Sequence, residues 1–453
     1  MELNQLQNFF NSNLNQHERI FLSIDNEFIN EENSIDLANC IKKCQNLQEL
    51  GLNITLSQIS EERLYQLYQA LKFCPNLQSL KLILESDQQS VVSIFGLGDS
   101  LEKCDKLREF SIDIAYNHIQ PEQICMLFRQ IANNQSISTL QFNLEGNQMD
   151  STLLSQIAIN LQKLKKLEKL SMNFRQGYLY SEGIIQFAQG MESFATLIDL
   201  SINLDSNQIS ESGAEALGKL IGNQIFLSSL DLNFNYNALC ANGVTKLIDQ
   251  IHKCSRIQSI SFKLQQNAID AKGAFAIGSA ISQCKTLVNL CLDLSQNSIG
   301  FQGLSDLVTQ LKLCKSLENL EVQTCYIQDD TVEELNLGLN QIKSIKQISF
   351  NFSSNTFDKV KAISDLANNL ELCANLVKLR LFLCSCYLEG NIIKPLGQAL
   401  KNSKSIANAY LDFSYNQIGD QGISDLGSAL ANCTNLQNLT FDLQQRQLIC
   451  FLL

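Results

Sequence analysis

Proline and glycine are scarce in this sequence, which has 3 prolines, 21 glycines and no tryptophan among its 453 residues. Together with an apolar fraction of 45%, this composition is typical of a folded protein and not of a disordered one. A run of about 18 apolar residues, the length that crosses a bilayer, is missing. The opening stretch MELNQLQNFF has an acidic second residue and lacks the apolar centre of a signal peptide. We therefore expect an intracellular protein, cytoplasmic or nuclear, without a membrane span.

A surplus of basic charge is also missing. The sequence has 34 Lys and Arg against 46 Asp and Glu, which gives a formal net charge of −12. Binding to nucleic acid or to anionic membranes usually requires clustered positive charge. The charge balance therefore argues against both, and the expected partner is a protein.

What the sequence has in abundance is one repeated segment. The stretch LVNLCLDLSQNSIG at 287–300 returns as IQSISFKLQQNAID at 257–270. Counted from the leading residue of each repeat as position 0, apolar residues recur at positions 0, 3, 5 and 7. Positions 3, 5 and 7 alternate with polar residues, which predicts a half-buried strand. The leading residues, 30 apart except for one interval of 28 and one of 31, are His17, Leu47, Leu77, Leu107, Ile137, Leu167, Leu197, Leu227, Ile257, Leu287, Leu317, Ile345, Leu376, Ile406 and Leu436.

Position 10 of the repeat is asparagine in many repeats. An Asn side chain offers two N–H donors and an acceptor, so a stack of them can satisfy backbone groups that a turn leaves unpaired. We interpret this column as a structural ladder. Its members are Asn117, Asn147, Asn207, Asn237, Asn267, Asn297, Asn355 and Asn416.

Half of the 16 cysteines stand in another column, three residues before the leading apolar residue. We interpret the column as a packing position, because free cysteine behaves as a small buried hydrophobe. All sixteen thiols are expected to be free and the compartment reducing. The column consists of Cys44, Cys74, Cys104, Cys254, Cys284, Cys314, Cys373 and Cys433.

The second half of each repeat is predicted to be helical. Apolar residues such as Leu307 and Leu311 lie on one helix face. A glycine column marks either close backbone packing or an unusual dihedral angle; it holds Gly183, Gly213, Gly243, Gly273, Gly303 and Gly422. One strand and one helix cannot bury their own apolar faces, whereas stacked repeats can. We expect an N-terminal capping segment at 1–16 and about fifteen repeats over 17–453, the last of them incomplete.

The pattern LxxLxLxLxxNxI followed by a helix resembles the leucine-rich repeat in its ribonuclease-inhibitor-like form, with two residues inserted before the Asn. The resemblance implies an α/β solenoid, a curved horseshoe with a parallel β-sheet on the concave face and helices on the convex face. In the short repeat LENLEVQTCYI the insertion is missing, and Cys325 is expected at the ladder position. Dropping two residues preserves which side chains face inward. Cys386 is expected at the same position of a later repeat.

The sequence offers no constellation for catalysis. The three histidines, His17, His118 and His252, occupy unrelated repeat positions, and a Ser or Cys nucleophile is not activated without a base. Cys384 and Cys386 are expected to face opposite sides, whereas zinc needs about four convergent ligands. Phosphate-binding and kinase motifs are missing. We predict no catalytic, cofactor-binding or metal-binding residues, and no enzyme.

The concave face is where a partner is expected, because positions 2, 4, 6 and 8 point to solvent. This trough carries more acidic than basic side chains, which favours binding of a basic or polar segment of a partner protein. A polar face is, however, also what any solvated surface shows. The acidic residues of the trough include Glu145, Asp205, Asp231 and Glu321.

One spot in the trough departs from the polar pattern. Arg380 and Phe382 alternate outward on one strand, Tyr410 stands beside Arg380 on the next, and Asp412 follows. Parallel strands lie about 4.8 Å apart, so Arg380 can lie against the Tyr410 ring. Arginine with aromatic residues is typical of binding hot spots, and packing between long side chains is the alternative interpretation. These four residues form the predicted partner-binding site.

The sequence thus favours a non-enzymatic scaffold that binds a protein through the concave face. Three other functions remain open: an inhibitor or GTPase-activating-type regulator, the repeat portion of a kinase-related protein lacking the kinase domain, and a prenylated membrane-attached adaptor. The last rests on the final four residues, Cys-Phe-Leu-Leu, in which Cys450 is the residue that prenylation would modify.

Overall fold

The structure is a computed structural model that describes residues 2–24, 31–55, 59–85, 93–327, 335, 337–357 and 360–444. The chain forms two compact units, Met1–Leu227 and Ser228–Leu453. These are the first and the second unit.

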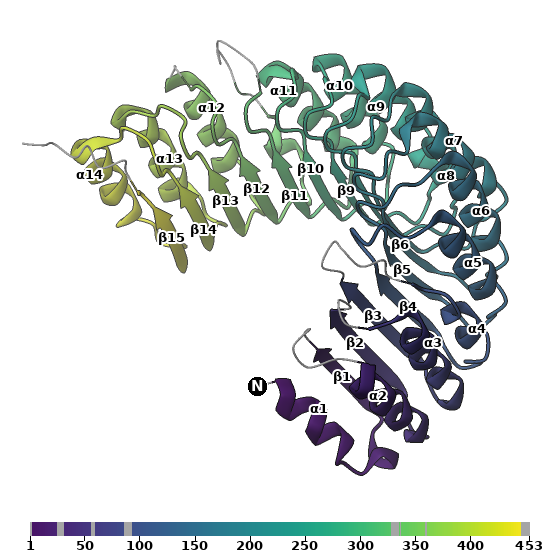
Figure 1. Ribbon diagram of the computed structural model, residues 1–453. Coiled ribbons are helices and arrows are strands. Elements are labelled where there is room, and N and C mark those ends of the chain that lie inside the picture. The colour runs from purple at the N-terminus through teal and green to yellow at the C-terminus, as the bar shows by residue number, and fades with distance from the viewer. Residues whose placement is uncertain are drawn as a thin grey trace, which may run out of the picture. The chain divides into compact units, whose positions relative to one another are not determined.

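The first unit alternates strands and helices in chain order (Figure 1). Its strands are β1 Arg19–Ile24, β2 Glu49–Thr55, β3 Ser79–Glu85, β4 Glu109–Asp113, β5 Thr139–Asn143, β6 Lys169–Asn173 and β7 Asp199–Asn203. Its α-helices are α1 Glu2–Phe10, α2 Glu31–Lys43, α3 Glu61–Ala70, α4 Leu97–Leu101, α5 Pro121–Ile131, α6 Ser151–Leu161, α7 Tyr180–Gly190 and α8 Glu211–Gly222. Short 3-10 helices lie at η1 Leu14–Gln16 and η2 Leu71–Phe73.

The second unit repeats the same alternation. Its strands are β8 Ser229–Asn233, β9 Ser259–Lys263, β10 Asn289–Asp293, β11 Asn319–Gln323, β12 Gln347–Asn351, β13 Lys378–Phe382, β14 Asn408–Asp412 and β15 Asn438–Asp442. Its α-helices are α9 Cys240–Ile248, α10 Ala271–Ile281, α11 Gly300–Gln310, α12 Val360–Glu371, α13 Gly390–Asn402 and α14 Gly419–Leu430. The 3-10 helices are η3 Ile251–Lys253, η4 Leu311–Leu313 and η5 Leu339–Gln341.

Within each unit the strands form a parallel sheet whose order follows the sequence. In the first unit every strand pairs with its successor from β1 to β7, and in the second from β8 to β15. Figure 1 shows helices along one face of each sheet and the other face uncovered; the uncovered face is called the open face below. The predicted α/β solenoid of parallel strands and helices is confirmed.

The core lies between the sheet and the helices. On β10 the register pairs Leu290 with Ile260 on one side and Leu320 on the other, and all three side chains are at most 2% exposed. Burying a leucine or isoleucine side chain stabilises the fold by about 1.5–3 kcal/mol. Because equivalent residues pair from strand to strand, the apolar positions of successive repeats form continuous buried columns.

The glycine column is explained by close packing of successive helices. A Cβ atom on Gly303 would lie 2.8 Å from the Cα atom of Ala271, and one on Gly273 would lie 3.2 Å from the Cα atom of Ala241. Neither glycine has a positive φ angle. Of the two explanations that the sequence left open, the structure therefore supports the close approach of backbones.

Helix α1 packs at the beginning of the first unit. Its Leu6 and Phe9 side chains are buried, and the Phe9 ring lies 5.8 Å from the His17 ring, measured between centroids. His17 in turn hydrogen-bonds through Nε2 to Ser12 Oγ at 2.7 Å. These contacts suit a capping segment, and the boundary after residue 16 stays a prediction.

The short repeat differs from the prediction made for it. Gln296 donates its N–H to Cys325 O at 2.8 Å, the bond that elsewhere joins position 9 to position 8 of the next repeat. Tyr326 has a φ of 54°, as do other residues at position 9. Cys325 Sγ donates to Asn351 O of the following repeat at 3.9 Å, whereas side chains at the ladder position donate to the preceding repeat. Ile327 donates its N–H to Asn355 Oδ1 at 2.9 Å. The placement of Cys325 at the ladder position was wrong, because the strand keeps its usual register through Cys325 and the shortening falls beyond it.

The other cysteine expected at the ladder position takes that place. Cys386 Sγ donates to Phe352 O of the preceding repeat at 3.3 Å, and the Cys386 N–H donates to Asn416 Oδ1 at 2.9 Å. The side chain is fully buried. Burial raises the pKa of the Cys386 thiol to about 12, so the thiol stays protonated and able to donate.

Candidate functional site

The asparagine column forms a hydrogen-bonded ladder between repeats. Asn297 Nδ2 donates to Leu264 O of the preceding repeat at 2.8 Å and to Leu294 O of its own at 3.0 Å. Its Oδ1 accepts the N–H groups of Asn267 and Ile269, both at 3.0 Å. Other members of the column also donate from Nδ2 to a backbone carbonyl 33 residues earlier; these are Asn117, Asn147, Asn207, Asn267 and Asn416.

Two members of the column show variations of this geometry. Asn355 donates to Thr324 O at 2.7 Å, 31 residues back, because the intervening repeat is short. Asn237 is half-buried and donates to Phe234 O and Asn235 O at 3.0 and 3.1 Å. The contribution of the column to stability stays a prediction.

The cysteine column makes a second set of bonds between repeats. Cys314 Sγ donates to Ile281 O at 3.4 Å, 33 residues back. Asn134 stands in the same column and reaches Leu101 O at 2.9 Å, also 33 residues back. Side chains of this column therefore fill space in the core and also donate hydrogen bonds to backbone carbonyl groups of the preceding repeat. Sequence reasoning missed this, although an amide in a cysteine column was a usable signal.

The thiols of this column are poor nucleophiles. Burial raises the pKa of the Cys74, Cys104 and Cys284 thiols to about 12, and that of the Cys314 thiol to about 11. The cysteines at described positions are free, and Cys450 lies outside the described residues. A protonated, buried thiol reacts slowly, because the thiolate is the reactive form.

The open face of the first unit contains an ion cluster. Arg175 NH1 lies 2.8 Å from Glu145 Oε1, and Arg175 Nε lies 3.6 Å from Asp205 Oδ1. Tyr116 Oη donates to Glu145 Oε1 at 2.6 Å, and Asn173 Nδ2 donates to Glu145 Oε2 at 3.0 Å. Two acids of the predicted trough are thus matched by a cation of the same sheet, which sequence reasoning did not single out.

The cluster changes the titration of its members. Burial pushes the pKa of Glu145 upward, but the hydrogen bonds from Tyr116, Asn173 and Arg175 outweigh it and hold the pKa below its usual value. The hydrogen bond to Glu145 raises the pKa of Tyr116. Glu145 is therefore an ionised carboxylate whose oxygens already accept hydrogen bonds from Tyr116, Asn173 and Arg175, so it is not available to a partner.

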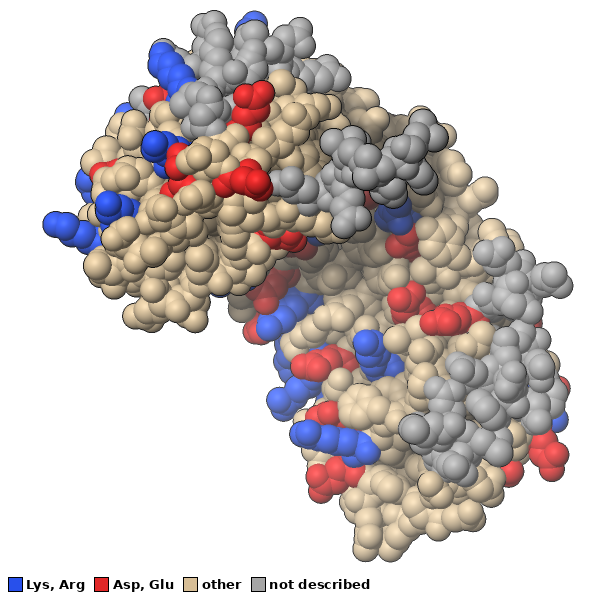
Figure 2. Space-filling model, turned by 90° about the vertical axis from the view of Figure 1, so that its left-hand side faces the viewer, with Lys and Arg blue, Asp and Glu red and all other residues tan. Residues whose placement is uncertain are grey.

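Charges of both signs are mixed on the visible surface. Figure 2 shows Lys and Arg beside Asp and Glu, with larger uncharged areas between them. The acid-leaning trough read from the sequence is therefore accompanied by basic side chains, and local arrangement matters more than the net charge of −12.

The predicted partner site lies on β13 and β14 of the second unit. The register pairs Arg380 with Tyr410 and Phe382 with Asp412. The ring that lies against Tyr410 is that of Phe382, on the diagonal, with centroids 5.1 Å apart and an interplanar angle of 41°. Arg380 is exposed, and the other three are half-buried. Asp412 Oδ1 accepts from Ser414 N and Oγ at 2.9 and 2.6 Å.

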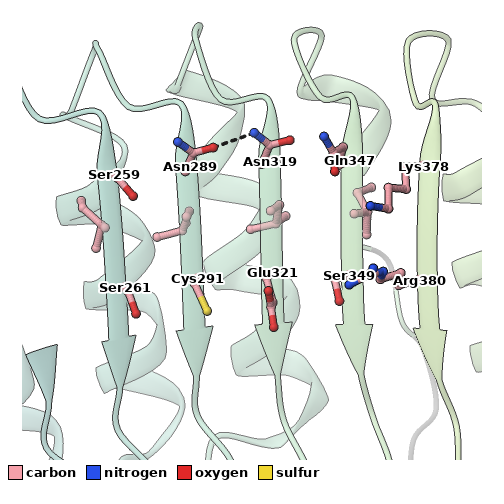
Figure 3. A pocket seen from close by; sticks show the side chains of 14 residues that line it. Ser259, Ser261, Asn289, Cys291, Asn319, Glu321, Gln347, Ser349, Lys378 and Arg380 are labelled. Carbon is pink, nitrogen blue, oxygen red and sulfur yellow. Dashed lines mark hydrogen bonds between the residues drawn. The ribbon is translucent and has the colours of Figure 1, made fainter. Parts of the chain in front are cut away.

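A hollow adjoins this site on the open face. It has a volume of about 200 Å³ and is lined by side chains from β9 to β13, Arg380 among them. Figure 3 shows two rows of side chains crossing the strands, with Asn289, Asn319, Gln347 and Lys378 in one and Arg380 in the other. Lys378 was not among the predicted residues. It stands two residues before Arg380 on the same strand, and this spacing could have predicted that both side chains face the same side of the sheet.

The described residues contain no group of three or more His, Cys, Asp or Glu side chains that could hold a metal ion. His252 Nδ1 hydrogen-bonds to Asp249 O at 2.9 Å, and His118 has a φ of 50° in a turn. Within the same part of the chain, no helix is long and apolar enough to cross a membrane.

Comparison with known proteins identifies the repeat. A family model described as leucine rich repeat matches residues 410–427, which run from β14 into α14. No curated protein matches the chain. Leucine-rich repeats are generally non-enzymatic protein-interaction modules. The matched repeat, the parallel sheets in chain order and the alternating helices fit a leucine-rich-repeat protein.

Proposed function

We propose that this protein is a non-enzymatic scaffold that binds a protein partner through the open face of the second unit, centred on Arg380, Phe382, Tyr410 and Asp412. The observation that carries the proposal is the ring pair of Phe382 and Tyr410 on an otherwise polar sheet face. Aromatic residues and arginine contribute most of the binding energy at many interfaces.

The arrangement suits an anchor for a partner. The two rings pack against each other, and such a contact stabilises by about 0.5–1.5 kcal/mol in addition to the burial of apolar area. Because the rings already restrict each other's rotation, little side-chain entropy is lost when a partner binds. Arg380, exposed beside them, can donate in a plane to carbonyl or carboxylate groups. Polar residues around the pair supply the rim that excludes water from a hot spot.

Mutation of the ring pair tests this function. A partner captured by cross-linking would be identified and purified, and its affinity measured by calorimetry for the native chain and for Tyr410→Ala. We expect a loss of about 30-fold, equivalent to about 2 kcal/mol. The matched control is Phe21→Ala, which removes a 66% exposed aromatic from β1 in the first unit. Equal effects of the two substitutions would contradict the proposal.

We also propose a cytoplasmic or nuclear location and assignment to the ribonuclease-inhibitor-like group of repeats. The buried thiol column supports the location, since free structural thiols suit a reducing compartment. The long helices between strands, such as α6 and α11, support the group. Imaging of the tagged full-length chain tests the location, and secretion into the medium would contradict it.

A further inference from the structure

The hollow on the open face of the second unit has walls of neutral hydrogen-bonding side chains. Asn289, Asn319 and Gln347 form one row, in which Asn319 Nδ2 donates to Asn289 Oδ1 at 2.6 Å (Figure 3). Ser261 and Ser349 belong to the other row. Such side chains can donate to and accept from the backbone of an extended peptide, but they do not select its charge.

The charge of the hollow comes from Lys378 and Arg380, which alternate on β13. Figure 3 shows both side chains leaning from β13 toward β12. Their register neighbours on β12 are Gln347 and Ser349, and neither is acidic. On the other side, β14 presents Asn408 and Tyr410, which are not acidic either.

Within the described part of the chain, neither Lys378 nor Arg380 has a side-chain hydrogen bond or an ion pair. Two other lysines of the same unit are paired with acids, although lysines such as Lys401 and Lys404 have no such partner among the described residues. Lys346 Nζ lies 2.7 Å from Glu318 Oε1, and Lys394 Nζ lies 3.6 Å from Asp425 Oδ2.

Glu321 is the acid that lines the hollow, and it does not neutralise the two cations. It stands on β11, two strands from β13, so about 10 Å separates the strands. At that distance, solvent-exposed charges are largely screened at physiological salt. Glu321 Oε1 also accepts from Gln323 Nε2 at 3.2 Å. The other nearby acid is Asp412 on β14, diagonal to Arg380, and its Oδ1 accepts from Ser414 N and Oγ at 2.9 and 2.6 Å. Because Arg380 and Lys378 both lean toward β12, away from β14, the end of the hollow at β13 is positively charged.

We propose that Lys378 and Arg380 bind carboxylate side chains of an acidic, extended segment of the partner protein, while the amide row of the hollow binds that segment's backbone. The proposal rests on the proposed function and specifies its ligand. It reverses the polarity expected from the acid-leaning sequence of the trough, because the charges that lack partners here are basic. Charge-assisted hydrogen bonds from Lys and Arg to carboxylates are stronger than neutral ones.

Selection from a random library of 12-residue peptides tests the proposal on the full chain. Four proteins are compared: the native chain, Lys378→Gln/Arg380→Gln, Phe382→Ala and Lys401→Gln/Lys404→Gln. The last is the matched control, because it removes the same charge from two exposed lysines outside the hollow. We expect Asp and Glu enrichment on the native and control chains, and its loss on Lys378→Gln/Arg380→Gln. The selected acidic peptides should bind that variant at least about tenfold more weakly.

Salt dependence of the native chain provides a second readout that does not depend on the folding of any variant. Affinity for the acidic peptides should fall as NaCl is raised, because opposite charges attract less under screening. Selection without acidic enrichment, no selected peptide, or undiminished affinity in Lys378→Gln/Arg380→Gln would overturn the inference. If selected peptides depend on Phe382 but not on acidic residues, only this inference fails. If none depends on Phe382, the proposed function fails as well.

Discussion

The ring of Phe382 packs against that of Tyr410 with 5.1 Å between centroids, although the residue directly opposite Tyr410 in the sheet register is Arg380. The aromatic contact thus runs along the diagonal between strands. It leaves the Arg380 side chain free to lean toward β12, over the hollow (Figure 3). The aromatic pair of Phe382 and Tyr410 therefore lies next to the positively charged end of the hollow, on the same open face.

The Asn ladder is predicted to stabilise the stack. Asn297→Ala removes a buried donor and acceptor and leaves the N–H groups of Asn267 and Ile269 without this partner. Each unsatisfied buried group costs about 1–3 kcal/mol, so we expect a loss of about 2–4 kcal/mol in the free energy of unfolding, measured with urea. Asn289→Ala, at an exposed position, is the control and should cost less than about 0.5 kcal/mol. Equal losses would contradict a structural role for the ladder.

Two glycine substitutions should have opposite effects. Gly303→Ala places a Cβ atom 2.8 Å from the Ala271 Cα atom, so the helices must separate and stability should fall by about 1–3 kcal/mol. Gly427→Ala meets nothing within 4 Å inside α14, so the better helix propensity of alanine should stabilise the protein by about 0.5–1 kcal/mol. Thermal melts measure both changes. Stabilisation by Gly303→Ala would refute the close-packing explanation.

Thiol labelling should separate the buried column from exposed cysteine. With the native protein near pH 8, Cys240, which is exposed, should react with maleimide at least about a hundredfold faster than Cys74, whose pKa burial raises to about 12. Peptide mass spectrometry gives the rate at each site. After denaturation without a reductant, we expect all sixteen cysteines to be labelled. Protected pairs would show disulfides and argue against a reducing compartment.

The ion cluster of the first unit should make stability depend on pH. The folded-state pKa of Glu145 lies below its usual value, so its contribution is present above that usual value and is lost as the pH falls through the folded-state pKa. Arg175→Gln should lower the free energy of unfolding at pH 7 by about 1 kcal/mol, discounted because Arg175 is partly exposed. The difference from the native chain should shrink on acidification. A difference that does not change with pH would contradict the linkage.

The repeat architecture could be predicted because each strand occupies the same place in a fixed period. Apolar alternation at Leu290, Leu292 and Leu294 shows which face is buried, and stacking then sets the order of strands. The short repeat could not be placed, because its length shows that two residues are missing but not where. The bond from Gln296 N–H to Cys325 O and the contact of Cys325 Sγ with Asn351 O of the following repeat show that Cys325 is not at the ladder position.

The candidate site was predictable in part, for a geometric reason. Repeat positions give neighbours straight across the sheet, and Arg380 beside Tyr410 is such a pair. Long side chains also reach diagonally, which the period does not reveal, so the contact of Phe382 with Tyr410 was not predicted. The bridging of Glu145 and Asp205 by Arg175 was within reach of the same reasoning from repeat positions, because the three residues stand 30 apart at position 8 of successive repeats.

The measurement that tests the account most directly compares Phe382→Ala with Leu381→Ala, two neighbours on β13 that face opposite sides of the sheet. Affinity for the identified partner and the urea unfolding midpoint are measured for both. Leu381 is fully buried, so its truncation should cost about 2–5 kcal/mol of stability. Phe382→Ala should leave stability within about 1 kcal/mol of native, the scale of the ring contact that it removes, and weaken binding by about 30-fold. If Phe382→Ala instead destabilises the fold as much as Leu381→Ala and leaves affinity unchanged, the ring pair is packing, and the partner binds elsewhere.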